Sequence, residues 1–435
     1  MKKIYPILIL MFIFLSWYVC VNGMMSNKSN YKKYIKKAEE CEDGGYYKDA
    51  INNYQYALKI DSKDKKIEKK ICINYYNLNN HSEFISRAEK IISENKGDAE
   101  LSELITKSYI QDNKIVDALA SINEGLSYDR KNKDLNKLYD QIKGKYESGR
   151  SSFSEAAEFD DIGMIIDLNG TYGILDNKGE SITKNKGYKK IFSLGSIGTE
   201  KGFTAETDNG IYYYDLDEYK RYTPDIKLVY LGTFNDGKAL ISDGKKWGYI
   251  DEDFSILNLE YEDATAFYDG YAAVKKNDKW AIIDSSLKEV TDYKYDNIIT
   301  DDYKICSRGK VVFAKENGKY SLIKSINGET ISGDYDNAKP FLGKNNGAAV
   351  SKNGKWGLIG NDGKEILKMN YEELGSESQE LVPYKEKGKW GYLSKNGDVF
   401  ISPEFSEVKA FNKNGFAAVK SEKSWELIHL YLFEK

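Results

Sequence analysis

The sequence predicts three consecutive structures: a membrane-spanning helix, an array of α-helical repeats, and a longer array of β repeats. Three observations lead to this prediction. An apolar run occupies residues 4–21, residues 31–132 repeat with a period of 34, and an aromatic residue recurs every 33 to 40 residues between 172 and 425. The predicted fold class is therefore multidomain, with helices first and strands second.

The composition is that of a folded chain without a strong net charge. Hydrophobic residues make up 41% and charged residues 30% of the sequence, and the formal net charge is −4. Such a chain can bury a core, and it has no excess of positive charge to attract a phosphate backbone. Nucleic acid is therefore not an expected partner.

Residues 1–25 form the predicted membrane segment. The eighteen residues 4–21 would extend about 27 Å as a helix, close to the thickness of the hydrocarbon core of a bilayer. Two outcomes stay open: an uncleaved anchor gives a single-pass protein of the cell membrane, and cleavage after Gly23 gives a secreted one. Lys2 and Lys3 favour a cytoplasmic N-terminus, whereas five lysines between 28 and 37 oppose it. Because the short basic start has the form of a signal sequence, we expect both arrays outside the cytoplasm.

Residues 31–149 are predicted to form helical repeats. Ala50, Phe84 and Ala118 are each 34 residues apart, and apolar residues recur at helical spacing without a proline. The period and the stretch 45–58 resemble the tetratricopeptide (TPR) repeat. The resemblance implies three units, 31–64, 65–98 and 99–132, followed by a capping helix over 133–148.

In such arrays the first helix of each pair lines a groove that takes a peptide or an extended protein segment. The resemblance places seven residues of this chain in the groove. These are Lys32, Lys36, Lys69, Lys70, Tyr76, Lys107 and Gln111. The alternative is that these polar side chains form an ordinary solvated helix face.

After a polar linker over 151–158, residues 159–435 are predicted to form about eight β units. Three or four short antiparallel strands are expected in each unit, because hairpin signals such as Asn353-Gly354 recur. Each unit has one aromatic anchor. The anchors are Tyr172, Tyr212, Trp247, Trp280, Tyr320, Trp356, Trp390 and Trp425.

The strings around these anchors, such as the Trp-Gly dipeptides at 247, 356 and 390, resemble bacterial WG (KWG) repeats. In the strand that begins at Trp247, Trp247 and Tyr249 lie on one face while Gly248 and Ile250 lie on the other. Both faces are therefore apolar or bare, which suits a blade packed between neighbouring blades. This favours a circular β-propeller-like array over an open β-solenoid, with the anchors as core residues rather than ligand platforms.

No motif for catalysis, for a cofactor or for a metal ion is present. The two histidines, His81 and His429, lie in different arrays, and phosphate-loop and dinucleotide motifs are absent. We therefore expect no catalytic residue, no metal ligand, no cofactor and no enzymatic activity. The four cysteines are spaced unlike a disulfide framework and are expected to be free thiols.

The sequence thus favours a membrane-anchored, extracytoplasmic interaction or scaffolding protein. Its expected partners are a protein or peptide segment and a cell-envelope component, bound through two repeat surfaces. Two other interpretations stay open. One is an enzyme that acts on envelope glycan from the rim of the β array, and the other is a structural spacer at the cell surface.

Overall fold

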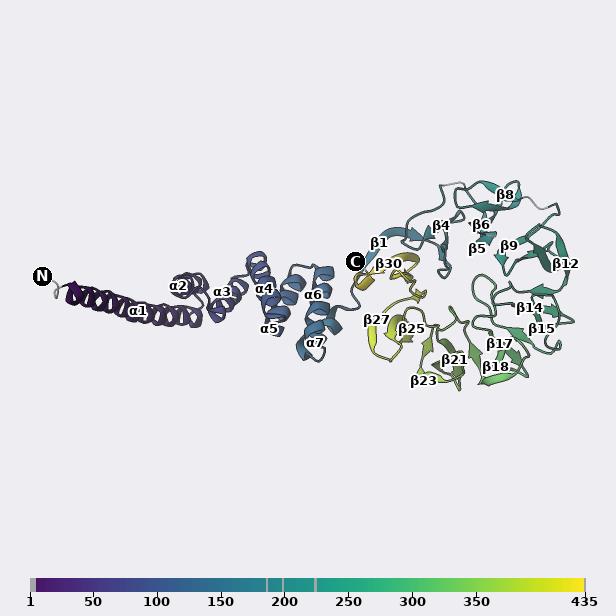
Figure 1. Cartoon of the computed structure of the whole chain (residues 1–435). Coiled ribbons are helices and arrows are strands. Elements are labelled where there is room, and N and C mark those ends of the chain that lie inside the picture. Colours follow the sequence, from purple (N-terminus) through teal and green to yellow (C-terminus); the bar gives the residue numbers. More distant parts are fainter. Residues whose placement is uncertain (1–4, 185–186, 198, 223–224, 434–435) are drawn as a thin grey trace. The chain divides into compact units, whose positions relative to one another are not determined.

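The chain divides into two units between Lys143 and Gly144, the helical unit and the β unit. The computed structural model describes residues 5–184, 187–197, 199–222 and 225–433. Figure 1 shows the helices in purple and blue and the strands in teal to yellow. Each unit has hydrophobic cores of its own.

The helical unit consists of hairpins that follow the predicted period. Its described helices are α1 (Tyr5–Asp43), α2 (Tyr47–Ile60), α3 (Lys65–Asn77), α4 (His81–Asn95), α5 (Ala99–Gln111), α6 (Ile115–Tyr128) and α7 (Lys133–Ile142). The pairs α1–α2, α3–α4 and α5–α6 pack as hairpins, and α7 packs against α5 and α6. The capping helix is shorter than expected, because α7 ends at Ile142 rather than at 148.

Residues one period apart occupy equivalent core positions in the helical unit. Ala50, Phe84 and Ala118 are all fully buried. The larger Phe84 fits because Tyr76 packs edge-on against its ring, with the ring centroids 5.3 Å apart. Side-chain caps fix where several helices begin: the carboxylate of Asp64 accepts hydrogen bonds from the backbone at the start of α3, and Asp98 does the same for α5.

Helix α1 joins the apolar run to the first repeat without a loop. Within the described residues, no helix combines the length and the apolar composition that crossing a membrane requires. That statement does not cover most of the expected span over 4–21, because residue 4 and the side chains of 5–14 and 18–24 are not among those described. The membrane anchor therefore stays a prediction.

The β unit consists of short antiparallel strands grouped into sheets. The strands are β1 (Tyr146–Phe153), β2 (Glu155–Ala156), β3 (Gly163–Asp167), β4 (Tyr172–Asp176), β5 (Lys190–Ile197), β6 (Glu200–Thr207), β7 (Gly210–Asp215), β8 (Lys220–Tyr222), β9 (Tyr230–Asn235), β10 (Lys238–Ser242), β11 (Trp247–Asp251), β12 (Ile256–Tyr261), β13 (Asp263–Ala264), β14 (Tyr271–Lys276), β15 (Lys279–Asp284), β16 (Asn297–Ile298), β17 (Val311–Glu316), β18 (Lys319–Lys324), β19 (Thr330–Tyr335), β20 (Asn337–Ala338), β21 (Ala348–Lys352), β22 (Lys355–Ile359), β23 (Glu365–Tyr371), β24 (Glu373–Leu374), β25 (Leu381–Glu386), β26 (Lys389–Ser394), β27 (Val399–Phe405), β28 (Glu407–Val408), β29 (Phe416–Ser421) and β30 (Ser424–Leu430).

These strands form eight blades within the described residues. One eight-stranded sheet comprises two blades that are joined by the single residue pair Ser196 and Phe234. In chain order, blades 1 to 8 are β2–β4, β5–β8, β9–β12, β13–β15, β16–β19, β20–β23, β24–β27, and β28–β30 with β1. Figure 1 shows them arranged as a ring.

The ring closes between the last blade and the first. Strand β1 pairs antiparallel with β30, from Tyr146 opposite Leu430 to Phe153 opposite Trp425. Side chains of blades 8 and 1 then share a core that contains Trp425, Met164 and Ile166. The β unit is therefore a closed, propeller-like array and not an open solenoid.

This closure corrects two expected boundaries. The helical repeats were expected to extend to 149 and a polar linker to occupy 151–158, but β1 begins at Tyr146 and β2 at Glu155. The stretch is polar because β1 is the outermost strand of blade 8 and needs few apolar side chains. Its strand conformation comes from pairing with β30, which lies at the opposite end of the β unit in sequence.

Where a glycine follows the anchor tryptophan, as at Gly248 and Gly391, it is required by crowding and not by its backbone angles; Trp280 is followed by Ala281 and Trp425 by Glu426. A Cβ atom added at Gly391 would lie 2.4 Å from the carbonyl oxygen of Ile401, and one at Gly248 would lie 2.0 Å from that of Asn258. In both blades the next strand bulges at this point, and its backbone crosses over the glycine. In blade 5 the glycine is on the other strand, because Ser321 follows the anchor and Gly333 lies against Ser321.

We predict that Gly391→Ala destabilises the β unit by about 2 kcal/mol, because the outer strand must move to admit the methyl group. Gly173→Ala is the matched control at the equivalent position of blade 1, where the nearest atom to an added Cβ is a side-chain oxygen, Thr183 Oγ1, at 3.1 Å. Chemical unfolding followed by tryptophan fluorescence measures both variants. Equal losses of stability would contradict the role assigned to the bulge.

Candidate functional site

The seven predicted groove residues lie on the first helices of the hairpins. Lys32 and Lys36 are on α1, Lys69, Lys70 and Tyr76 on α3, and Lys107 and Gln111 on α5. Helices α3 and α5 contact each other, as do α5 and α7. The structure therefore places these residues on the successive helices that the resemblance predicted, but most of the charges have partners within the helical unit.

Lys69 ties the second repeat to the third. Its Nζ lies 2.7 Å from Asp98 Oδ2 and 2.9 Å from a carboxylate oxygen of Glu100. Burial works to lower the pKa of Lys69, but the hydrogen bonds with Asp98 and Glu100 outweigh this effect and raise it. The ammonium group is thus held by the start of α5, where Asp98 also caps the helix.

Lys70 ties the second repeat to the first. Its Nζ lies 2.9 Å from Glu42 Oε2, which also accepts a hydrogen bond of 2.7 Å from the hydroxyl of Tyr54. Asn74 donates a further hydrogen bond to the same carboxylate. Burial works to raise the pKa of Glu42, but these hydrogen bonds outweigh it and hold the pKa below its ordinary value.

The other groove residues add little free positive charge. Lys107 pairs with Glu103 one turn earlier, and Tyr76 stacks on His81. Lys36 lies 3.9 Å from Glu40 on its own helix. Lys32 and Gln111 are exposed. The lysines of this face therefore serve mainly to join neighbouring repeats and to balance acidic side chains.

The aromatic anchors of the β unit lie between blades. Trp425, Trp280, Tyr320 and Tyr212 are buried, while Tyr172, Trp247, Trp356 and Trp390 are half-buried against the cores that separate neighbouring blades. A lysine on the adjoining strand lies over several of the rings. Lys385 Nζ is 5.6 Å from the ring centroid of Trp390 and 3.5 Å from Glu373 Oε2. Lys420 likewise lies over the ring of Trp425 and forms an ion pair with Glu407.

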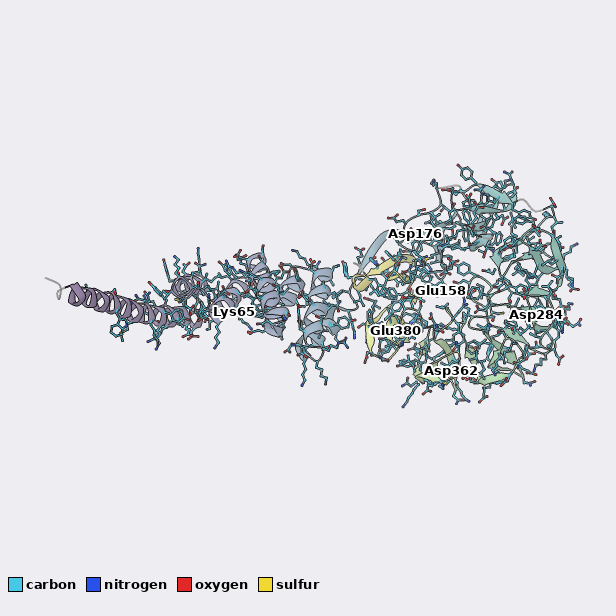
Figure 2. All side chains as sticks on the ribbon, viewed as in Figure 1. Lys65, Glu158, Asp176, Asp284, Asp362 and Glu380 are labelled. Atoms are coloured by element: carbon cyan, nitrogen blue, oxygen red, sulfur yellow. The ribbon has the colours of Figure 1, made fainter. Side chains whose placement is uncertain are left out.

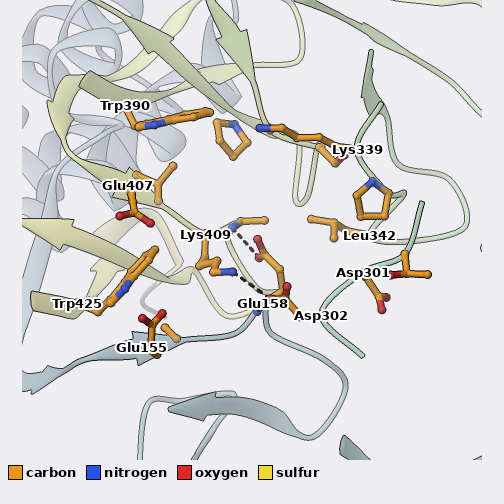
Figure 3. A pocket seen from close by; sticks show the side chains of 18 residues that line it. Glu155, Glu158, Asp301, Asp302, Lys339, Leu342, Trp390, Glu407, Lys409 and Trp425 are labelled. Carbon is orange, nitrogen blue, oxygen red and sulfur yellow. Dashed lines mark hydrogen bonds and ion pairs between the residues drawn. The ribbon is translucent and has the colours of Figure 1, made fainter. Parts of the chain in front are cut away.

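A cavity of about 360 Å³ opens beside two of these anchors. Figure 3 shows Trp390 and Trp425 on one side of it, with Glu407 between them and Lys409 and Glu158 near the middle of the view. Glu155, Lys339, Leu342 and two prolines complete most of its wall. The cavity is therefore built by blades 1, 5, 6, 7 and 8.

The centre of the ring is crossed by a loop of blade 5. Asp302 Oδ2 accepts hydrogen bonds from the backbone N–H of Glu158, at 2.8 Å, and from Lys409 Nζ, at 3.0 Å. The hydroxyl of Tyr303 donates a hydrogen bond of 2.7 Å to the carbonyl of Glu158. The loop thereby connects blade 5 with blades 1 and 8, and it lines both the first cavity and a second one of about 630 Å³. Figure 2 shows Glu158 nearer the middle of the ring than Asp284 and Asp362.

Burial shifts the pKa values of the acidic side chains at this crossing. It raises the pKa of the half-buried Glu158, and it raises that of Asp160 to about 6. It also raises the pKa of Asp301, although Arg308 Nη2 lies 2.6 Å from its carboxylate. For Lys409, the nearby Glu158 and Asp302 outweigh burial and raise the pKa. Glu158, Asp160 and Asp301 thus share one cause, burial, for their raised pKa values.

The model of the WG containing repeat matches residues 247–280, 322–356, 356–390 and 390–425. Residues 247–425 of this chain carry WG repeats. The resemblance noted in the sequence is confirmed over these residues, and most limits of the matched stretches coincide with anchor tryptophans. A search of curated proteins gave no match.

Three solved structures are similar to parts of the chain. The TPR domain of Arabidopsis OM64 has 14% identity and a TM-score of 0.24, covering 26% of this chain and 95% of that one. Kluyveromyces lactis Hsv2 has 10% identity and a TM-score of 0.38, covering 64% and 97%. The extracellular domain of the putative one-component system BT4673 from B. thetaiotaomicron has 11% identity and a TM-score of 0.37, covering 68% and 43%.

Sequence reasoning found the WG anchors but missed the cavity and the central crossing. Asp301 and Asp302 look like the many turn carboxylates of the array, such as Asp251, whose Oδ1 accepts backbone hydrogen bonds within its own turn. Gly375 gave no signal either, because the equivalent position is not conserved between blades: it is alanine, threonine or isoleucine in blades 1, 4 and 5 and lysine only in blades 6 and 8.

The described residues contain neither a disulfide nor a cluster of metal ligands. Cys41, Cys72 and Cys306 are free thiols, and burial raises the pKa of Cys72 and of Cys306 to about 12. Cys20 lies outside the described side chains. Among the described residues, no group of three or more His, Cys, Asp or Glu is placed to hold a metal ion.

We predict that reversing Lys69 and Lys70 together, as Lys69→Glu with Lys70→Glu, destabilises the helical unit by about 1 to 2 kcal/mol. The reason is that Asp98, Glu100 and Glu42 would then face like charges across the joints between repeats. Thermal melting followed by helical circular dichroism measures the loss. Lys32→Glu with Lys36→Glu, on the more exposed part of the same face, is the control and should change stability by no more than about 0.5 kcal/mol.

We predict that Asp160→Asn stabilises the β unit at pH 7.5 but not at pH 4. Because burial raises the pKa of Asp160 to about 6, the folded protein holds its proton more tightly than the unfolded chain. The free energy of unfolding should therefore fall as the pH rises from about 4 to about 6. Asp160→Asn should avoid this loss, which is about 1 to 2 kcal/mol after allowance for the partial exposure of Asp160. Tryptophan fluorescence reports mainly this unit, since five of the six tryptophans lie in it. A gain of equal size at both pH values, or an equal gain in the exposed neighbour Asp161→Asn, would contradict the prediction.

Proposed function

We propose that the chain is a membrane-anchored, extracytoplasmic interaction protein that acts by binding rather than by catalysis. The observation that supports this most is the presence of two repeat arrays in one chain, each with its own core. Repeat arrays present broad, rigid surfaces, and such surfaces bind extended partners. Two binding surfaces on one chain raise the effective concentration of the second partner once the first is bound.

In this proposal the helical unit captures a protein segment along α1, α3 and α5. Because Lys69, Lys70 and Lys107 are paired with acids of the same unit, we infer that the segment is not selected by negative charge. Recognition would rest on shape and on polar side chains at the exposed ends, such as Lys32 and Gln111. The β unit would dock the second partner, an envelope component.

The membrane anchor would hold this assembly at the cell surface. The support is the continuity of α1, which carries the apolar run directly into the first hairpin. A partner captured by the first repeat would then be held close to the bilayer. The proposed orientation places both arrays outside the cytoplasm, in accordance with the basic residues at the start of the chain.

The orientation can be tested with protease added to intact cells. We expect digestion of both arrays, because the proposed anchor would leave everything beyond residue 26 outside. An antibody against the C-terminal residues follows the loss of full-length protein, and a cytoplasmic protein serves as the control for lysis. Protection until the cells are broken would place the arrays in the cytoplasm.

The groove can be tested with a photo-reactive amino acid at Gln111. We expect one discrete crosslinked product in living cells, because Gln111 is exposed on α5 within the proposed groove. Lys90, which is 74% exposed on the second helix of a hairpin, is the matched control and should give no product of that mass. The same product from both positions, or none from Gln111, would favour the structural spacer over a groove-binding protein.

A further inference from the structure

The first helical hairpin carries its charges unevenly along its length. Residues 26–38 of α1 contain five lysines and no acidic residue, and residues 59–66, where α2 ends and α3 begins, contain four more lysines. Residues 39–43, at the turn between α1 and α2, contain four acidic residues and no lysine. We call the lysine-rich part, residues 26–38 and 59–66, the basic end of the hairpin.

Few acidic groups offset the lysines of the basic end. Asp64 accepts hydrogen bonds from the hydroxyl of Tyr31 and from two backbone N–H groups at the start of α3, and the Tyr31 contact lowers the pKa of Asp64. Asp61 Oδ1 accepts a hydrogen bond of 3.2 Å from the backbone N–H of Lys63. Because these are the two acidic residues among nine lysines, a large excess of positive charge remains.

Tyrosine contacts bring the two segments of the basic end together. Besides the hydrogen bond from Tyr31 to Asp64, the ring of Tyr34 on α1 stacks on that of Tyr56 on α2, with centroids 5.2 Å apart. Lys59 Nζ lies 4.9 Å from the centroid of the Tyr56 ring. The lysines of both segments therefore belong to one surface, at the level of Tyr31 on α1.

The basic end follows the apolar run on the same helix. Since α1 is continuous, Lys28 lies about 10 Å and Lys33 about 18 Å beyond Val21 along its axis, whereas the acidic turn lies about 30 Å away. In a bilayer-spanning α1 the headgroup layer would occupy the first 5 to 7 Å, roughly, beyond the hydrocarbon. Its field extends about 8 to 10 Å further at physiological salt, and so reaches the basic end but not the acidic turn.

The lysines of the basic end suit a charged surface better than an acidic peptide. Lys33, Lys59 and Lys63 are exposed and form no ion pair with a described side chain. The lysines that face the groove further along the array, such as Lys69 and Lys70, are instead paired with acids of the unit. Long cationic side chains without a fixed partner, spread over two segments, fit a fluid layer of phosphate groups.

We propose that the basic end of the first hairpin binds the anionic phospholipid headgroups of the membrane that α1 enters. The inference rests on the membrane anchor of the proposed function and gives the first repeat a partner of stated chemistry. The contact holds the hairpin against the bilayer by its lysines and keeps its acidic turn in water.

The test uses the full chain reconstituted into vesicles of phosphatidylcholine, with or without phosphatidylglycerol. A water-soluble reagent that acylates lysine, followed by peptide mass spectrometry, gives the labelling rate of each lysine. We expect the rates of Lys33, Lys59 and Lys63 to fall about fivefold in the anionic vesicles, because the headgroups cover the ammonium groups. Added salt should restore the rates.

Exposed lysines elsewhere in the helical unit are the internal controls, and their rates should change little. They are Lys48, Lys90 and Lys114. Equal rates in the two kinds of vesicle, or an equal fall at control lysines and basic-end lysines, overturns the proposal. Protection of the basic end by soluble polyglutamate, with none from phosphatidylglycerol, overturns it as well and favours an acidic protein segment.

A variant tests whether the lysines act together. Lys33→Gln, Lys59→Gln and Lys63→Gln combined should remove most of the protection of Lys66, a fourth lysine of the basic end, because too little charge remains to hold the hairpin at the surface. Helical circular dichroism confirms that the unit stays folded.

The matched variant combines Lys48→Gln, Lys90→Gln and Lys114→Gln. It removes the same charge from the same unit and should leave the protection of Lys66 unchanged. An equal loss of protection in both variants overturns the proposal, since the effect would then follow net charge and not the basic end.

These outcomes are separate from those of the proposed anchor. Flotation of the chain with vesicles of phosphatidylcholine alone tests the anchor, because these vesicles have no net charge. A chain that floats with them but gains no protection from phosphatidylglycerol keeps the anchor and loses the lipid contact. A chain that does not float with them but is protected by anionic vesicles keeps the lipid contact and loses the anchor.

Discussion

The β unit depends on the pairing of β1 with β30. Each WG blade is apolar on both faces, so it is stable only when a neighbour covers each face, and an open array would leave two faces in water. Pairing of β1 with β30 completes blade 8, and the core around Phe153 and Trp425 then joins that blade to blade 1. The chain builds this blade from residues near both ends of the unit, so the ring forms only after nearly the whole β unit is present.

The recurring residues serve this stacking. The anchor rings fill the cores between blades, the lysine over a ring also pairs with an acid of the innermost strand, and the glycine admits the bulged outer strand. Blade 5 shows that geometry, not residue identity, is what must be maintained. There the glycine is replaced by Ser321, and Gly333 on the opposing strand supplies the missing space.

The sequence predicted the features that recur from blade to blade, and it missed the features that occur only once. The anchor spacing predicted the number and type of units, because each blade needs one large ring between itself and its neighbour. The strand over 146–153 was missed, since Tyr-Glu-Ser-Gly-Arg-Ser-Ser-Phe has little local strand preference and pairs with residues more than 270 positions away. The positions of Lys69 and Lys70 were predicted, but their partners were not, because the stacking of one repeat on the next brings Asp98 and Glu42 to them.

Residues from four different blades meet at one place. Glu158 belongs to blade 1, Asp302 to the loop of blade 5, Gly375 to blade 7 and Lys409 to blade 8, yet Glu158, Asp302, Gly375 and Lys409 all line the same cavity. Residues shared by every blade are constrained by packing between neighbours, whereas Glu158, Asp302 and Lys409 form hydrogen bonds between blades across the centre. The raised pKa values of Glu158 and Asp301 mean that the charged acids are held there at a cost in stability. The ring bears that cost because these acids join blade 5 to blades 1 and 8 across the centre: Asp302 accepts hydrogen bonds from Glu158 and Lys409, and Asp301 pairs with Arg308.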